Sequence, residues 1–182
     1  MHHHVEGDRL ISWRARALAA LAVAGLAACS EQAPLEPWGD KPTPALEVKT
    51  LKGDAVSLQA LRGQVVVVNF WASWCEPCMA EMPSLARLSE RMKGRPLTIV
   101  TVNYAESREK IDLFLARTGL DLPVVADSQG DAADAWGVGG LPMTFVVDKA
   151  GRVRYRVFGE RNWDDSGTVQ GLDRLLAERP HA

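Results

Sequence analysis

The stretch that decides the fold is Phe70–Pro83, FWASWCEPCMAEMP, in which two cysteines enclose a Glu-Pro pair. The preceding run, Val65–Phe70 (VVVVNF), is rich in β-branched residues and does not alternate, which is typical of a strand buried on both faces. After Cys75, apolar residues recur at helical spacing as far as Met92. The sequence therefore predicts a strand, a turn and a helix, with the cysteine pair at the start of the helix.

The rest of the chain predicts further alternating strands and helices. A hairpin is predicted over Leu46–Leu58, because a Lys-Gly-Asp turn separates two short extended runs. The other expected elements are a strand at Thr98–Val102, a helix from an N-cap at Ser107 to Gly119, a helical turn at Gly130–Trp136, strands at Thr144–Asp148 and Arg152–Phe158, and a helix at Asp165–Glu178. This order predicts an α/β domain with a central mixed β-sheet, helices on both faces and an N-terminal β-hairpin.

The composition excludes several classes of function. The chain has 182 residues, of which 47% are hydrophobic and 24% charged, which suffices for one domain with a core. A formal net charge of -2 provides no field that attracts nucleic acid, so no nucleic-acid partner is expected. The histidines occupy residues 2–4 and 181. Their absence elsewhere argues against a Ser-His-Asp or Cys-His pair and against a His-ligated metal.

The N-terminal region has the pattern of a signal peptide. Residues 17–28, ALAALAVAGLAA, form an apolar run after three arginines, and the run is shorter than the roughly 20 residues that a membrane-spanning helix needs. Its end, Leu26–Cys29, resembles the bacterial lipobox, in which cleavage exposes a cysteine that carries lipid. We therefore expect a lipoprotein signal peptide at residues 1–28 and lipid attachment at Cys29. Ordinary cleavage near Ala28, with an unmodified Cys29, is the alternative.

Residues 29–44 contain four prolines and predict an extended, lipid-anchored tether that leads to the domain at residues 45–182. Either form of cleavage places the mature chain outside the cytoplasm, on the periplasmic side of a membrane. Inner and outer membrane stay open as alternatives. Besides Cys29, the mature chain then retains only Cys75 and Cys78. In an oxidising compartment the redox state of this pair depends on partners.

The pair Cys75 and Cys78 admits several kinds of site. Structural zinc needs four nitrogen or sulfur ligands, which one cysteine pair without histidine does not supply. Copper(I) could use two thiolates with a nearby methionine, so a copper-binding lipoprotein is kept as an alternative. As a structural staple, a four-residue loop stabilises by only about 2 kcal/mol. A cysteine at a helix N-terminus, by contrast, gains a stabilised thiolate, and the position therefore favours redox chemistry.

Two motifs in order carry a family resemblance. Val65–Leu85, VVVVNFWASWCEPCMAEMPSL, resembles the active site of the thioredoxin-like TlpA/ResA family of membrane-tethered thiol-disulfide oxidoreductases. Gly137–Asp148, GVGGLPMTFVVD, is similar to the proline loop of the same family. The resemblance covers about Leu46–Leu176. It implies a thioredoxin fold with Cys75 as the exposed attacking thiol, Cys78 as the buried resolving thiol, and no cofactor beyond this redox-active disulfide.

The same resemblance implies residues that support the active site. Pro142 is expected to be a cis-proline that faces the disulfide. Pro77 suits the first helical turn, where a missing N–H costs nothing. Glu76 places a negative charge beside the Cys75 thiolate and opposes its formation. Trp71 and Trp74 are expected to serve packing first and to be platforms for substrate second.

Two further positions concern the proton of the buried thiol. Many thioredoxins carry a buried aspartate in the strand before the active site, and the matching residue here is Asn69, which cannot shuttle a proton. Glu81 lies three residues after Cys78, on the same side of the predicted helix, and ResA-like proteins have a glutamate at this place that assists thiol chemistry. The hypothesis is that Glu81 is catalytic and exchanges the proton of Cys78; a solvated helix glutamate is the alternative. Trp163 is assigned to core or surface filling.

The resemblance implies an extracytoplasmic reductase of client protein disulfides. Its expected electron donor is a membrane thiol carrier of the DsbD or CcdA kind, and its clients would be cysteines of apocytochrome c, in cytochrome c maturation, or of copper sites. Met143 follows Pro142 where dedicated cytochrome c maturation thioredoxins have an acidic residue, which weakens that assignment. A disulfide oxidase or isomerase is the alternative within redox chemistry. A peroxidase is disfavoured by the local setting of the cysteines, and a monomer is expected.

Overall fold

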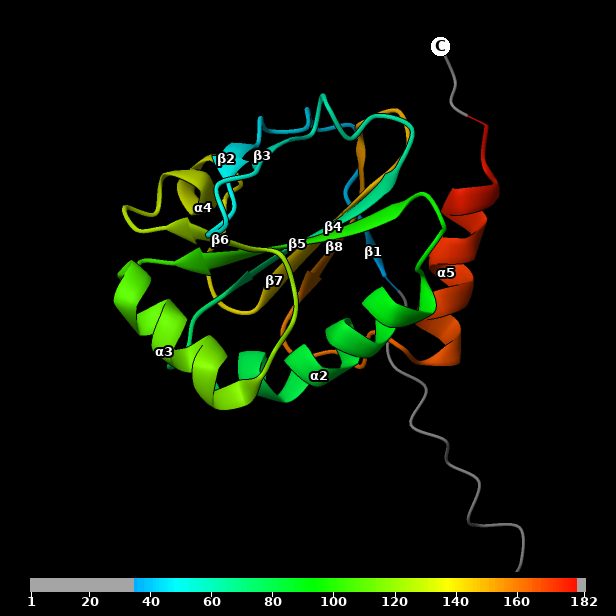
Figure 1. Cartoon of the computed structure of the whole chain (residues 1–182). Helices are drawn as coiled ribbons and strands as arrows, with labels where there is room; N and C mark the ends of the chain where they lie inside the picture. The colour runs from blue at the N-terminus through cyan, green and yellow to red at the C-terminus, as the bar shows by residue number, and fades with distance from the viewer. Residues whose placement is uncertain (1–34, 180–182) are drawn as a thin grey trace, which may run out of the picture. The chain divides into compact units, whose positions relative to one another are not determined.

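The computed structural model of the chain describes residues 35–179 (Figure 1). The predicted signal peptide and Cys29 lie outside these residues, so lipid attachment stays a prediction. Within residues 35–179, no helix has both the length and the apolar character needed to cross a membrane.

A six-stranded mixed sheet forms the centre of the fold, in the order β1-β8-β7-β4-β5-β6 (Figure 1). Its strands are β1 (Glu36–Pro37), β4 (Val65–Trp71), β5 (Leu97–Tyr104), β6 (Val124–Asp127), β7 (Met143–Val147) and β8 (Val153–Phe158). β4, β5 and β6 run parallel, whereas β7 is antiparallel to both β4 and β8. A separate hairpin pairs β2 (Glu47–Lys49) with β3 (Ala55–Ser57), which confirms the predicted N-terminal hairpin.

Helices cover both faces of the sheet, as predicted. α2 (Glu76–Arg91), α3 (Arg108–Thr118) and α5 (Ser166–Ala177) contribute to the core on one face. The short α4 (Asp131–Ala135) packs against the other face, to which the β2–β3 region also contributes. Because crossovers between parallel strands are right-handed, the helices that follow β4 and β5 fall on the same face.

The central strand β4 is buried along its whole length. Val66, Val68 and Phe70 belong to the core under α4, whereas Val65, Val67 and Trp71 belong to the core under α2. This alternation follows from the two-residue period of a strand, and it explains why the run is apolar without interruption. The exception is Asn69, a fully buried polar residue that points to the same face as Trp71 by this period.

The ends of the helices agree with the sequence signals. Ser107 is the N-cap of α3, and its hydroxyl accepts a hydrogen bond from the Lys110 N–H. Gly119 ends this helix with φ of 64°, a left-handed conformation that glycine adopts without strain. The strands β1 and β6 were not predicted, because two and four residues are too short to show a period.

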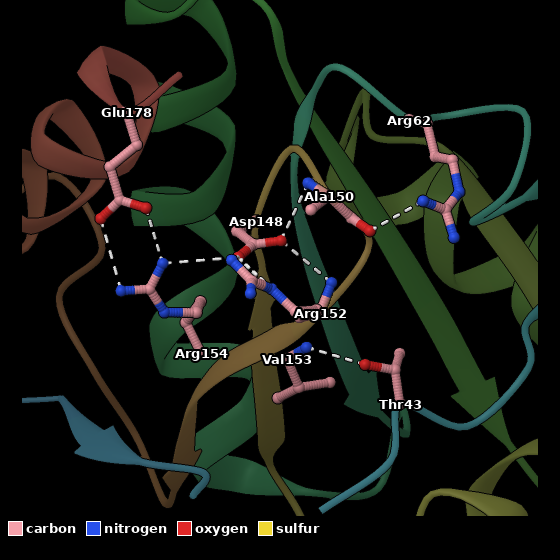
Figure 2. A network of polar contacts seen from close by, with 8 residues as sticks. All are labelled: Thr43, Arg62, Asp148, Ala150, Arg152, Val153, Arg154 and Glu178. Carbon is pink, nitrogen blue, oxygen red and sulfur yellow. Dashed lines mark hydrogen bonds and ion pairs between the residues drawn. The ribbon is translucent and has the colours of Figure 1, made fainter. Parts of the chain in front are cut away.

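Part of the segment predicted to be an extended tether is packed on the domain. β1 pairs with β8, and the Trp38 N–H donates to the Arg154 carbonyl at 2.9 Å. The Trp38 ring meets Phe145 edge-on, with 5.4 Å between ring centroids. The Thr43 hydroxyl accepts a backbone N–H of β8 at 2.9 Å (Figure 2). The packed domain therefore begins before residue 45, since prolines permit an edge strand although they exclude a helix.

A polar network joins the β7–β8 turn to the end of α5 (Figure 2). Asp148 accepts hydrogen bonds from the backbone N–H groups of Ala150 and Arg152 and from the Arg152 guanidinium. Arg154 contacts Asp148 at 3.4 Å and Glu178 at 2.6 Å. The network holds α5 against the sheet at the end opposite to the start of β7.

Trp38→Ala should lower the free energy of unfolding by about 2 kcal/mol, because a half-buried aromatic ring loses its contact with the core. Urea denaturation measures the change. Trp74→Ala is the matched control, since this ring is 66% exposed and its removal should change stability by less than about 0.5 kcal/mol. An unchanged midpoint for Trp38→Ala would show that the segment before residue 45 does not pack on the domain.

Candidate active site

The two cysteines lie at the carboxyl end of β4. This strand ends at Trp71, and Cys75 is the N-cap of α2, which follows. β7 runs antiparallel to β4, and its first residue, Met143, pairs with Phe70. Pro142, the residue before β7, therefore lies at the same edge of the sheet as the cysteines. Sites in α/β folds commonly form at the carboxyl ends of parallel strands.

The cysteines form a disulfide with an S–S distance of 2.07 Å. The Cys75 sulfur also accepts a hydrogen bond from the Cys78 N–H at 3.3 Å. Cys75 is 5% exposed and Cys78 is 0% exposed, so the resemblance overstated the exposure of Cys75 but gave the right order. Cys75 is the more exposed of the two cysteines, and it lies where a helix N-terminus favours a thiolate.

The residues around the disulfide divide into exposed and buried groups. Pro77 lies in the first turn of α2, as predicted, and Glu76 beside it is exposed. Trp74 is 66% exposed, so the packing role expected for it is wrong. The same expectation is confirmed for Trp71, because it is fully buried and its ring centroid lies 5.0 Å from that of Phe114.

The proline loop is fixed to the end of β8. The Leu141–Pro142 peptide bond is cis, as the resemblance implied. The carbonyl of Pro142 accepts a hydrogen bond from the Gly159 N–H at 2.9 Å. A Cβ atom on Gly140 would lie 2.9 Å from the ring of Phe158, so a larger residue here would require this exposed ring to shift.

Glu81 is the buried carboxylate of the site, with 1% of its surface exposed. Its Oε1 accepts from Asn69 Nδ2 at 2.7 Å, and its Oε2 accepts from Trp163 Nε1 at 3.0 Å and from the Arg161 backbone N–H at 3.2 Å. Burial raises the pKa of Glu81 to about 7, because the hydrogen bonds offset the desolvation only in part. Glu81 is therefore not a solvated helix glutamate, and it can exchange a proton near neutral pH one helical turn from Cys78.

None of the three residues that donate to this carboxylate was predicted to contact it. Trp163 was assigned to filling, yet its indole N–H donates to Glu81. Asn69 donates to Glu81 and also, at 2.8 Å, to the Thr144 hydroxyl on β7. The third is Arg161, which contributes its backbone N–H. The sequence offered one signal for this cluster, the single asparagine in an otherwise apolar strand.

A second buried carboxylate, Glu106, fixes the loop that leads to Cys75. It accepts from the Ser73 N–H at 2.7 Å, from the Ser73 hydroxyl at 2.6 Å and from Asn103 Nδ2 at 2.8 Å. Burial raises the pKa of Glu106, but the hydrogen bonds from Ser73 and Asn103 outweigh it, so the pKa lies below its ordinary 4.5. Glu106 stays ionised near neutral pH and holds the loop. No motif in the sequence indicated it.

The disulfide is the redox group found within residues 35–179. In the same range, no cluster of three or more His, Cys, Asp or Glu side chains is arranged to hold a metal ion.

Known proteins resemble this chain in sequence and in structure. Residues 40–156 match the AhpC/TSA family. The chain is 37% identical over 122 residues to the thiol-disulfide oxidoreductase ResA of Geobacillus kaustophilus (strain HTA426), across 67% of this chain and 70% of that protein.

Two solved structures share the fold. A thiol:disulfide interchange protein of the thioredoxin family from Chlorobium tepidum TLS is 25% identical with a TM-score of 0.63, across 80% of this chain and 100% of that one. StoA from Bacillus subtilis is 24% identical with a TM-score of 0.61, across 73% and 96% of the two chains. These structures show that the chain has a thioredoxin fold, as predicted.

Glu81→Gln should remove a pH dependence of stability. The pKa of Glu81 is raised from 4.5 to about 7 in the folded state, so the folded protein binds more protons than the unfolded chain between these values. Stability therefore falls as the pH rises through this window and stays low above it. The change is on the order of 3 kcal/mol.

Urea unfolding at about pH 5 and about pH 8 measures this change. Glu90→Gln, at an exposed position of the same helix, is the control and should keep the pH dependence. If Glu81→Gln also keeps it, the titrating group is not Glu81.

Proposed function

Because the chain belongs to the AhpC/TSA family and is a thiol-disulfide oxidoreductase of the ResA type, we propose that it reduces disulfides of client proteins outside the cytoplasm. The observation that carries this proposal is the Cys75–Cys78 disulfide at the N-terminus of α2, with one sulfur more accessible than the other. A buried carboxylate, Glu81, lies one turn further along the same helix.

The reaction starts from the reduced enzyme. The Cys75 thiolate attacks a client disulfide, one client sulfur leaves and takes up a proton, and a mixed disulfide forms. The Cys78 thiol then gives its proton to Glu81 and attacks the Cys75 sulfur. This step releases the second client sulfur, which takes up a proton, and leaves the enzyme oxidised. Two electrons pass to the client, and a dithiol donor must return them to the enzyme.

The donor and the clients follow from the family resemblance. A membrane thiol carrier of the DsbD or CcdA kind supplies the electrons, and the clients are cysteines of apocytochrome c or of copper sites. Lipid on Cys29 would hold the enzyme at the membrane beside such a carrier. The residue after Pro142 is Met143 rather than an acidic residue, which weakens the assignment to cytochrome c maturation, so copper-site cysteines stay in the proposal beside it.

Cys78→Ser should trap clients on Cys75, because the mixed disulfide forms but cannot be resolved. Mass spectrometry of the trapped complexes identifies the client cysteines, and reduction of insulin by the unmodified enzyme measures the exchange itself. Cys75→Ser is the control and should trap far fewer proteins, since Cys78 is fully buried. Equal trapping by the two variants would contradict the assigned order of attack.

The reduction potential separates a reductase from an oxidase. Glu76 places a negative charge beside Cys75 and opposes the thiolate that the helix end favours. A less stabilised thiolate makes the pair more reducing, so we expect a potential nearer roughly -270 mV than about -120 mV. Titration against glutathione measures it, and Glu76→Gln should raise it. A value above roughly -180 mV would contradict a reductase.

A further inference from the structure

We propose that Asn69 is a positioning residue for Glu81: its amide donates to the ionised carboxylate and turns over to accept from the protonated one. This inference rests on the proposed proton transfer from Cys78 to Glu81. It goes beyond that proposal because it names the group that accommodates both protonation states of the carboxylate.

Asn69 has an uneven set of hydrogen bonds. Its side chain is fully buried in β4, and Nδ2 donates to Glu81 Oε1 at 2.7 Å and to Thr144 Oγ1 at 2.8 Å. These contacts use both protons of the amide nitrogen. The amide oxygen, Oδ1, has no hydrogen-bond partner within residues 35–179. An unpartnered buried acceptor is costly, and its place next to a titrating carboxylate calls for an explanation.

The other contacts of Glu81 decide which oxygen takes the proton. Oε2 accepts from the Trp163 indole N–H and from the Arg161 backbone N–H, and neither group can become an acceptor. A proton on Oε2 would therefore face two donors. In the part of the chain that the structure describes, Oε1 has a single donor, Asn69 Nδ2, and this amide can offer its oxygen instead. The proton belongs on Oε1.

When Oε1 carries a proton, the Glu81 O–H and the Asn69 Nδ2–H are both donors, and they face each other across the 2.7 Å contact without an acceptor between them. A half-turn of the amide about the Cβ–Cγ bond removes this conflict, because it puts Oδ1 in the place of Nδ2. Oδ1 then accepts from the carboxyl O–H and also from the Thr144 hydroxyl, which can donate as well as accept. Each orientation leaves one atom of the amide without a partner among the described residues, Oδ1 before the turn and Nδ2 after it, so the protonation state of Glu81 decides which orientation is preferred.

The groups around Glu81 leave the Asn69 amide as the one that changes its hydrogen bonds when Glu81 takes up a proton. Groups from five parts of the chain face this region: Asn69 from β4, Thr144 from β7, Cys78 from α2, Glu160, Arg161 and Trp163 from the segment after β8, and Thr168 from α5. The Thr168 hydroxyl accepts a hydrogen bond from Arg161 Nε at 2.8 Å. Asn69 and Thr144 are neutral, so β4 and β7 supply hydrogen bonds rather than a counter-charge.

This arrangement also explains why β4 carries an asparagine. An aspartate at position 69 would place a second carboxylate within hydrogen-bond distance of Glu81, and two such groups cannot both be ionised. With an amide there, Glu81 titrates without a second carboxylate at hydrogen-bond distance on β4. Asn69 thus contributes to the proton step without carrying the proton.

The oxidised protein allows a direct test, because neither cysteine titrates in it. NMR can follow the carboxyl carbon of Glu81 and the side-chain amide of Asn69 as the pH changes. We expect the two signals to share one midpoint, and the Asn69 amide protons to move toward the positions of unbonded amides below it. Asn103 is the internal control, since its Nδ2 donates to Glu106, whose pKa is lowered, and its signals should not move in this range.

An Asn69 amide that stays hydrogen-bonded through the titration of Glu81, or that moves with a different midpoint, would overturn the inference. Insulin reduction by the same protein tests the proposed function separately. An active enzyme with a static amide overturns the inference alone, whereas an inert enzyme overturns the function and the amide signals still report on the inference.

Substitutions give a second readout, which tests the contact between position 69 and the titrating carboxylate on which the inference depends. Asn69→Asp should split the single titration into two steps, with the upper midpoint well above that of the unmodified protein, because the two carboxylates share one proton. Asn69→Asp combined with Glu81→Gln exchanges the acid and the amide and should restore one step. A single step at the original midpoint in Asn69→Asp would contradict the inference.

Discussion

The chemistry of this protein depends on one sulfur held at the N-terminus of a helix. The strand β4 is buried on both faces, and it ends at a fixed place at the edge of the sheet, where Cys75 becomes the N-cap of α2. Helix N–H groups and the helix dipole then favour a thiolate at that sulfur. The buried Glu106 holds the connecting loop through Ser73, so the position of Cys75 does not rely on the helix alone.

Two buried carboxylates near this sulfur have opposite properties, and their surroundings account for the difference. Glu106 is ringed by donors that outweigh its burial, so it stays charged and structural. For Glu81, burial outweighs the hydrogen bonds, so its charge is easily neutralised. The same side chain is thus an ionised anchor in one place, whereas in the other its raised pKa suits the proton-accepting role that we propose for it. The amide of Asn69 belongs to the second environment, where the charge changes.

Local sequence signals located most of the fold. The apolar run before Phe70, the N-cap at Ser107 and the glycine at Gly119 each have a local physical cause, and the structure has the corresponding strand and helix ends. The short strands β1 and β6 were missed because they are held by pairing with distant strands rather than by their own pattern. Proline content likewise hid the packing of Trp38, which depends on Phe145 more than a hundred residues away.

The site shows the same difference between features with a local sequence signal and features that depend on distant contacts. The cysteine pair and Pro142 were predictable because their motifs are local, whereas Trp163 and Glu106 reach the site only through the tertiary fold. The most direct test of the account is the order in which iodoacetamide modifies the two thiols of the reduced protein. The account predicts that Cys75 reacts first, with a thiol pKa below the ordinary value of about 8.5. Faster modification of Cys78, or two thiols that react only above that pH, would contradict it.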